Sequence, residues 1–149
     1  MPSRQRTWQE KLRDSKDLPK VGKVTGPMAR RFGRGTMVIP APLEVDALMR
    51  KVRPGKTTTI DALRDQLAKK HGVNMACPMT TGIFAWIAAH AAAEAEAEGK
   101  SRITPYWRTL KSGGELNPKY PGGLAEIRRR LEAEGHSIVV RGKRVFVVS

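Results

Sequence analysis

The chain has 149 residues, which is enough for one ordinary domain with some extra length at an end. Its net charge of +14 and pI near 10.6 predict a polyanionic partner; we expect double-stranded DNA, the alternative being a basic surface that serves only solubility. One cysteine and three scattered histidines exclude a disulfide framework and a multi-cysteine zinc site, so we expect no metal and no cofactor. No apolar run approaches the roughly 20 residues that cross a bilayer, and no signal-peptide core is present. We therefore expect a cytoplasmic protein, nucleoid-associated if bacterial, with no membrane association.

Residues 1–36 are rich in arginine and lysine, and glycine and proline interrupt every periodic pattern after Lys16. This composition predicts a basic N-terminal arm, within which the sequence allows a short helix around residues 8–15. We expect the arm to contact phosphates, and the alternative is a solvated tail. The candidate contact residues are Arg4, Arg6, Arg30, Arg31 and Arg34.

Two helices are predicted in the next part of the chain. Apolar residues recur at spacings of three and four from Pro42, which suits a first helical turn, and predict a helix over residues 42–53. A Pro-Gly pair ends this helix. Thr58 and Asp61 then resemble a capping box, which predicts a second helix over residues 59–70.

A third helix is predicted from Pro78 to Glu98, after a turn at residues 72–74. Two helices joined by a short turn suggest helix-turn-helix geometry, although helical hairpins that bind no DNA are at least as common. The third helix has no lysine or arginine, so only its N-terminal turn is expected to face phosphate, through backbone amides and the hydroxyls of Thr80 and Thr81. Trp86 and His90 are its other amphipathic candidates.

The remaining chain is predicted to form a loop, a helix and a hairpin. Residues 103–123 interleave glycine and proline with aromatic residues, and a loop of this length is often functional. A last helix is predicted over residues 123–134, with three consecutive arginines, 128–130, mostly outward. A β-hairpin is predicted over residues 137–148. Its tip is basic and resembles the wing of a winged-helix protein. The alternative is that the hairpin only covers an edge of the core with charged residues. The cations of the tip are Arg141, Lys143 and Arg144.

These patterns together predict a mostly α fold with a small β component. The expected architecture is a winged-helix-like helix-turn-helix DNA-binding domain over residues 37–149, with the hairpin at its C-terminal end. The basic arm of residues 1–36 precedes this domain.

Five short segments keep a recognisable order and spacing between Pro42 and His136. They are VRPGKTTTI at 52–60, ITPYWRTL at 103–110, SGG at 112–114, YPGGL at 120–124 and LEAEGH at 131–136. Together they resemble the C-terminal DNA-binding domain of the O6-alkylguanine-DNA alkyltransferases. They resemble still more closely the alkyltransferase-like proteins, which lack the acceptor cysteine.

The resemblance fixes the register of a four-residue motif. The enzymes carry Pro-Cys-His-Arg, and the cysteine accepts the alkyl group from a flipped guanine. In this chain Pro105 and Arg108 match the motif, whereas Tyr106 and Trp107 replace the cysteine and the histidine. A phenol with a pKa near 10 is a poor nucleophile at neutral pH, and no base is adjacent. We therefore expect no catalytic residue here and no alkyl transfer, as in the alkyltransferase-like proteins, which bind alkylated guanine without repairing it.

The same resemblance implies a pocket for the alkylated base. Aromatic and apolar walls can offset the few kcal/mol that an extruded base loses in stacking. The alternative is that Tyr106 and Trp107 fill the core beneath a loop. Thr81 and Ile60 stand where the family usually has its flipping arginine and its phosphate-rotating tyrosine. The implied pocket residues are Pro105, Tyr106, Trp107, Arg108, Tyr120, Gly122 and Gly123.

Three functions follow from these observations. The first is a non-enzymatic protein that recognises O6-alkylguanine or distorted DNA and promotes its repair, with nucleotide excision repair proteins as partners. The second is a transcriptional or architectural DNA-binding protein that uses the same scaffold. The third is an active alkyltransferase that uses Cys77, although a small buried residue is the simpler interpretation of that cysteine.

Overall fold

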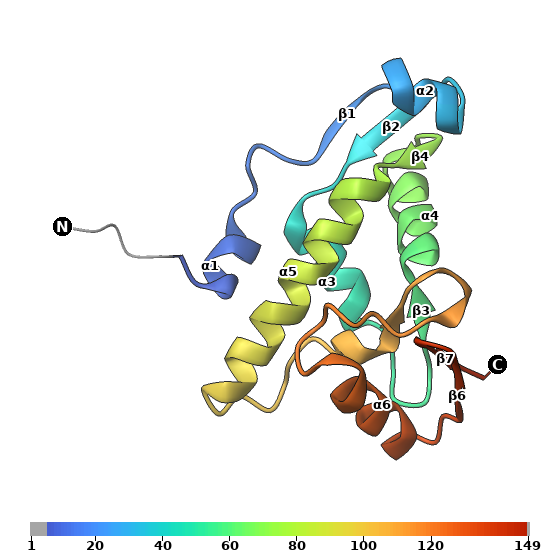
Figure 1. The fold of residues 1–149 in the computed structure, drawn as a ribbon. Helices are drawn as coiled ribbons and strands as arrows, with labels where there is room; N and C mark the ends of the chain where they lie inside the picture. The colour runs from blue at the N-terminus through green and yellow to red at the C-terminus, as the bar shows by residue number, and fades with distance from the viewer. Residues whose placement is uncertain (1–5, 149) are drawn as a thin grey trace.

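The computed structural model describes residues 6–148, and helices dominate it (Figure 1). The helices are α1 (Trp8–Arg13), α2 (Gly26–Phe32), α3 (Pro42–Arg50), α4 (Ile60–His71), α5 (Pro78–Ala97) and α6 (Gly123–Ala133), with short 3-10 turns η1 (Tyr106–Arg108) and η2 (Ser112–Gly114). The strands are β1 (Lys20–Lys23), β2 (Thr36–Ile39), β3 (Thr58–Thr59), β4 (Met75–Ala76), β5 (Thr109–Leu110), β6 (Ile138–Arg141) and β7 (Arg144–Val147). The prediction of a mostly α fold with a small β component is confirmed.

The four predicted helices are observed as α3, α4, α5 and α6, and the predicted hairpin is observed as β6–β7. Pro42 and Pro78 stand in the first turns of their helices, where proline costs no hydrogen bond. The cap of α4 differs by one residue from the expected capping box, because the Thr59 hydroxyl accepts the Ala62 amide at 3.1 Å. Thr58 lies in strand β3 and pairs with Thr109 instead.

Helix α5 is the centre of the molecule, and α1, α3 and α4 all pack against it (Figure 1). Alanine makes this close packing feasible, because its small side chain lets neighbouring helices approach the α5 backbone. Ala85, Ala88 and Ala89 are completely buried, and so are Met49 of α3 and Leu67 of α4. The hydrophobic core therefore surrounds α5.

Parts of the segment that the sequence assigns to a basic arm pack onto this core, although β1 and α2 have no buried residue. Leu12 of α1 and Val24 after β1 are buried, and Trp8 packs against the core cluster. Strand β1 pairs antiparallel with β2, which pairs parallel with β4. Charged residues dominate the composition of this segment. The few apolar residues that attach it to the core are therefore difficult to recognise in the sequence.

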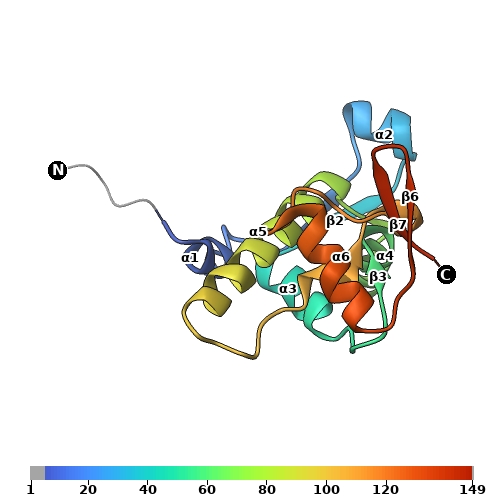
Figure 2. The ribbon, with the colours of Figure 1, turned by 60° about the horizontal axis from the view of Figure 1, so that its bottom comes forward.

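Two small pairings position the C-terminal part of the chain. Strands β3 and β5 pair in parallel and hold the loop after η1 against the start of α4. Glu115 bridges to Phe146 and so attaches the hairpin to the loop. Figure 2 shows α6 between the C-terminal end of α5 and the hairpin. Within residues 6–148, no helix is long and apolar enough to span a membrane.

Candidate functional site

The turn at residues 105–108 lies in the interior of the molecule. It forms the 3-10 turn η1, which packs against α5 and α6. Only 1% of Tyr106 is exposed, and 9% of Trp107 and of Arg108. The structure therefore brings the predicted motif together with Tyr120, which is also buried. These residues form a packed cluster, whereas the resemblance implies a pocket.

Tyr106 is enclosed by aromatic rings and a cation. Its ring meets those of Trp107 and Tyr120 edge to face, at centroid distances of 5.3 and 6.3 Å. The Arg130 guanidinium lies 5.6 Å from the same ring. The Tyr106 hydroxyl donates to the Pro121 carbonyl at 3.4 Å, and burial raises the pKa of the phenol. A neutral phenol whose hydrogen-bond partner among residues 6–148 is a carbonyl and not a base is a poor nucleophile.

Trp107 and Arg108 converge on one carboxylate, that of Glu134. Arg108 donates to it through Nε at 2.9 Å and Nη2 at 2.6 Å, and Trp107 donates through Nε1 at 3.1 Å. Arg108 also donates to the Val52 carbonyl at 2.7 Å. Burial alone would raise the pKa of Glu134, but these donors outweigh it and hold that pKa below its ordinary value. These contacts fix the turn to α6 and to the end of α3.

The loop beside the cluster has a backbone that only glycine adopts easily. Gly122 has φ +81°, and a Cβ added there would come within 2.5 Å of the Glu126 Cβ. Gly123, at φ +67°, begins α6. With Tyr106 almost fully covered, the described residues leave no opening onto its ring. In the structure, Tyr106 and Trp107 therefore fill the core beneath this loop. An extruded base would reach them only if the loop moved.

Arg130 lies inward, whereas the sequence predicts that all three arginines of this helix face mostly outward. Its guanidinium lies 4.6 Å from the Trp107 ring centroid, and its side chain is only 16% exposed. It also pairs with Glu126 and Glu96, which places it between α6 and α5. The spacing of apolar residues along a helix cannot reveal an arginine that stacks on a distant tryptophan.

The expectation for Thr80 and Thr81 is corrected by the structure. Thr81 is completely buried, and its hydroxyl donates to the Cys77 carbonyl at 2.7 Å, one helical turn earlier. The Thr80 hydroxyl is also buried, without a hydrogen-bond partner among residues 6–148. Neither hydroxyl therefore lies on a surface that could contact a phosphate in this conformation.

An open groove runs along α5 instead. Trp86 and His90 both hydrogen-bond to the Lys119 carbonyl, at 3.2 and 3.4 Å. Ile83 on the same face is 45% exposed. Burial lowers the pKa of His90, which favours its neutral form. The groove is lined by Gly82, Ile83, Trp86, His90, Asn117 and Lys119.

The predicted phosphate contacts lie at separate places on the molecule. Arg6, beside α1, donates to Asp14 at 3.0 Å, whereas Arg4 lies outside the described residues. Helix α2 and the hairpin are well apart from each other and from α1 in Figure 1. The structure thus does not gather these cations into one patch. The exposed members are Arg30, Arg31 and Arg34 in or near α2, and Arg141, Lys143 and Arg144 at the hairpin tip.

Cys77 is a small buried residue at the start of α5. It is 6% exposed, its amide donates to the Val38 carbonyl at 2.9 Å, and its own carbonyl accepts the Thr81 hydroxyl. Within the described residues, no group of histidine, cysteine and carboxylate side chains could hold a metal ion.

The arrangement of these helices and small sheets is similar to the fold of a solved alkyltransferase-like protein. In particular, the chain is similar to S. pombe Atl1, as seen in its crystal structure in complex with damaged DNA containing O6-carboxymethylguanine. The match has a TM-score of 0.51 and 18% sequence identity, and it covers 72% of this chain and 87% of that chain. No protein-family model matches the sequence, and no curated protein does.

Proposed function

We propose that this chain is a non-enzymatic DNA-binding protein that recognises O6-alkylguanine or distorted DNA and promotes its repair. The observation that carries the proposal is the fold, which is similar to that of a protein solved in complex with damaged DNA. The position of Tyr106 supports the non-enzymatic part, because its phenol is buried, neutral and bonded to a carbonyl.

The charge supports DNA as the partner. A net charge of +14 favours binding to a polyanion, because each lysine or arginine that neutralises a phosphate releases condensed counterions. The exposed cations of α2 and the hairpin tip are suited to this role. Such contacts position DNA without reading its sequence.

Recognition of a lesion requires the aromatic cluster to open. The loop at residues 117–123 covers Tyr106 through Tyr120 and through the Pro121 carbonyl. If this loop moves, the rings of Tyr106, Trp107 and Tyr120 become available to stack on an extruded base, which offsets the cost of unstacking it. A binder that does not react leaves the lesion in place, so nucleotide excision repair proteins are the partners we propose.

A binding experiment with two otherwise identical duplexes tests the proposal. One duplex contains O6-methylguanine and the other guanine, and each is titrated at 50 and 200 mM salt. We expect tighter binding to the modified duplex, and a steep loss of affinity for both duplexes at the higher salt. Equal affinity for the two duplexes would remove lesion recognition and leave DNA binding, whereas no binding at either salt concentration would overturn both.

A transcriptional or architectural role is the second candidate, and the closed state of the Tyr106 cluster favours it. A protein that never opens this cluster would use only its exposed cations and the groove along α5. Selection from a random duplex pool distinguishes the two, because an enriched sequence motif supports this second role.

Alkyl transfer to Cys77 is tested by intact-mass measurement after incubation with methylated DNA. We expect no change in mass, since the thiol is buried and at the base of α5. A stable gain of one methyl group on Cys77 would contradict the non-enzymatic proposal.

A further inference from the structure

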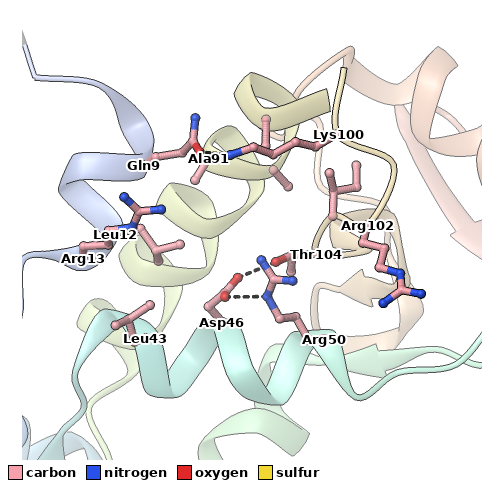
Figure 3. Close-up of a pocket in the computed structure, with 13 residues that line it drawn as sticks. Gln9, Leu12, Arg13, Leu43, Asp46, Arg50, Ala91, Lys100, Arg102 and Thr104 are labelled. Carbon is pink, nitrogen blue, oxygen red and sulfur yellow. Dashed lines mark hydrogen bonds and ion pairs between the residues drawn. The ribbon is translucent and has the colours of Figure 1, made fainter. Parts of the chain in front are cut away.

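A second cavity lies away from the Tyr106 cluster, between α1, α3, α5 and the segment after α5 (Figure 3). Its volume is about 170 Å³, and it is more enclosed than the groove beside Trp86. A pocket for a whole drug-sized ligand measures about 300 Å³ or more. This cavity therefore admits a small ligand or a single chemical group of a larger one. The polar residues that line it are Gln9, Arg13, Asp46, Arg50, Lys100, Arg102 and Thr104.

The lining of this cavity is strongly cationic. Four lysine and arginine side chains line it, against a single carboxylate, that of Asp46. Asp46 is 4% exposed and already engaged, because it accepts the Thr104 hydroxyl at 2.6 Å and the Arg50 Nε at 2.9 Å (Figure 3). The carboxylate thus orients Arg50 and neutralises one positive charge. The other three cations have no carboxylate within the lining.

Two of these cations have no partner in the described chain. Arg13 and Arg102 are exposed, and neither forms an ion pair or a hydrogen bond with a side chain among residues 6–148. Among the described residues, the Lys100 ammonium donates only to the side-chain amide oxygen Oε1 of Gln9, at 3.3 Å. Arg13, Lys100 and Arg102 each contribute a positive charge to the lining, and all three would attract an anion that enters the cavity.

Gln9, which lines the cavity, also contacts two acidic residues that do not line it. Its amide nitrogen donates to Glu94 at 2.9 Å and to Glu98 at 3.0 Å, while its oxygen faces Lys100. Neither glutamate lines the cavity. Both carboxylates are therefore engaged by the Gln9 amide nitrogen and do not belong to the lining.

We infer that this cavity binds a phosphate monoester group. Such a group is close to a dianion at neutral pH and presents three acceptor oxygens, which match the donor forks of several arginines. A phosphodiester within a nucleic acid strand carries one charge and continues on both sides, so it fits a half-enclosed cavity less well. The monoester has two sources: a small phosphate compound free in solution, or the terminal phosphate of a nucleic acid strand.

The site is separate from the proposed lesion site. Its lining includes none of the rings proposed to stack on the base, which are those of Tyr106, Trp107 and Tyr120. The inference therefore does not depend on lesion recognition, and one can fail while the other stands.

The test is calorimetric titration of inorganic phosphate into the full chain at low salt. The variant is Arg13→Gln with Arg102→Gln, and the control is Arg53→Gln with Arg128→Gln, which removes the same charge from exposed positions outside the cavity. We expect saturable binding to the wild type and the control, and at least about tenfold weaker binding to the cavity variant. Absence of saturable binding in the wild type, or equal affinity in the cavity variant, would overturn the inference.

Two further pairs of probes distinguish the sources of the phosphate. Tighter binding of a 5′-phosphorylated duplex than of its 5′-hydroxyl counterpart, lost in the cavity variant, assigns the site to strand ends. Tighter binding of adenosine monophosphate than of adenosine, with no effect of the duplex end, assigns it to free phosphate compounds. Both results support a monoester site. We expect the cavity variant to keep its preference for a modified duplex, which separates this site from the proposed function.

Discussion

The guanidinium of Arg108 and the carboxylate of Glu134 form a two-pronged ion pair, with nitrogen to oxygen distances of 2.9 and 2.6 Å. The pair joins η1 to α6, and the Arg108 contact with the Val52 carbonyl extends it to the end of α3. Because both side chains are mostly buried, each depends on the other to compensate its charge. The position of Tyr106 follows from this pair, since the tyrosine lies two residues before Arg108 in the same turn.

Removal of one partner of this pair should strongly destabilise the protein. We expect Glu134→Gln to lower the free energy of unfolding by about 3 kcal/mol, because the Arg108 charge stays buried without its counterion. Urea denaturation measures the loss. Glu132→Gln is the control, since its pair with Arg128 is about half exposed and should contribute no more than about 1 kcal/mol. A loss in Glu134→Gln no greater than in the control would show that the pair adds little to stability.

The same carboxylate predicts an acid-sensitive stability. The pKa of Glu134 is lowered in the folded protein from an ordinary value of 4.5, so the unfolded chain binds the proton more readily. The stabilisation is fully present above pH 4.5 and is lost as the pH falls through the lower, folded pKa. We expect the stability gap between wild type and Glu134→Gln to shrink over this acid range in urea titrations. A gap that is constant between pH 7 and pH 3 would contradict the assignment.

The helices were predictable because their signals are local. Proline in the first turn and apolar residues at helical spacing define α3 and α5 within a short window of sequence. The β1–β2–β4 sheet was not predictable, since its strands are two to four residues long and their partners lie up to 38 residues apart. Exposed, lysine-rich β1 has the composition of a tail, and only its pairing with β2 makes it a strand.

That three aromatic residues of the candidate site lie together was predictable, but their closed packing was not. The resemblance brought Tyr106, Trp107 and Tyr120 together, and the structure packs all three into one cluster. Closure of the cluster depends on tertiary contacts, above all those of Glu134 and Arg130, that no short motif encodes. The inward turn of the Thr81 hydroxyl, by contrast, was open to prediction, because a threonine inside a helix commonly donates to the carbonyl four residues earlier.

Trp8 should determine whether the N-terminal segment stays attached to the core. Its ring stacks on His90 at a centroid distance of 4.5 Å and meets Trp86 edge to face at 4.9 Å. We expect Trp8→Ala to cost about 3 kcal/mol or less of stability, since the site is only partly buried, and to release α1. Hydrogen exchange should then accelerate at residues 8–13 and not in α4. Unchanged protection of α1 would show that Leu12 and the Glu94 contacts hold it without the tryptophan.

Cations at the hairpin tip should set the salt dependence of DNA binding if the tip contacts phosphates. Arg141→Gln with Lys143→Gln removes two exposed charges, and Lys69→Gln with Arg53→Gln is the matched control. We expect the tip variant to weaken binding to modified and unmodified duplexes equally. The slope of log affinity against log salt should fall by about 2, since each lost phosphate contact removes about 0.9. Equal slopes in the two variants would place the hairpin outside the DNA interface.

Substitutions of Tyr106 separate the roles of its ring and of its hydroxyl in lesion preference. Tyr106→Phe removes only a 3.4 Å hydrogen bond and should cost no more than about 1.5 kcal/mol of stability. It should also keep any preference for the O6-methylguanine duplex, because stacking needs the ring. Tyr106→Ala should cost about 3 kcal/mol and abolish the preference. Leu67→Ala, a similar deletion in the fully buried core of α4, controls for destabilisation and should keep the preference. The measurement is the ratio of affinities for the two duplexes, well below the unfolding temperature of each variant. If Tyr106→Ala keeps the wild-type ratio, the base does not stack on this ring, and the cluster serves only as core.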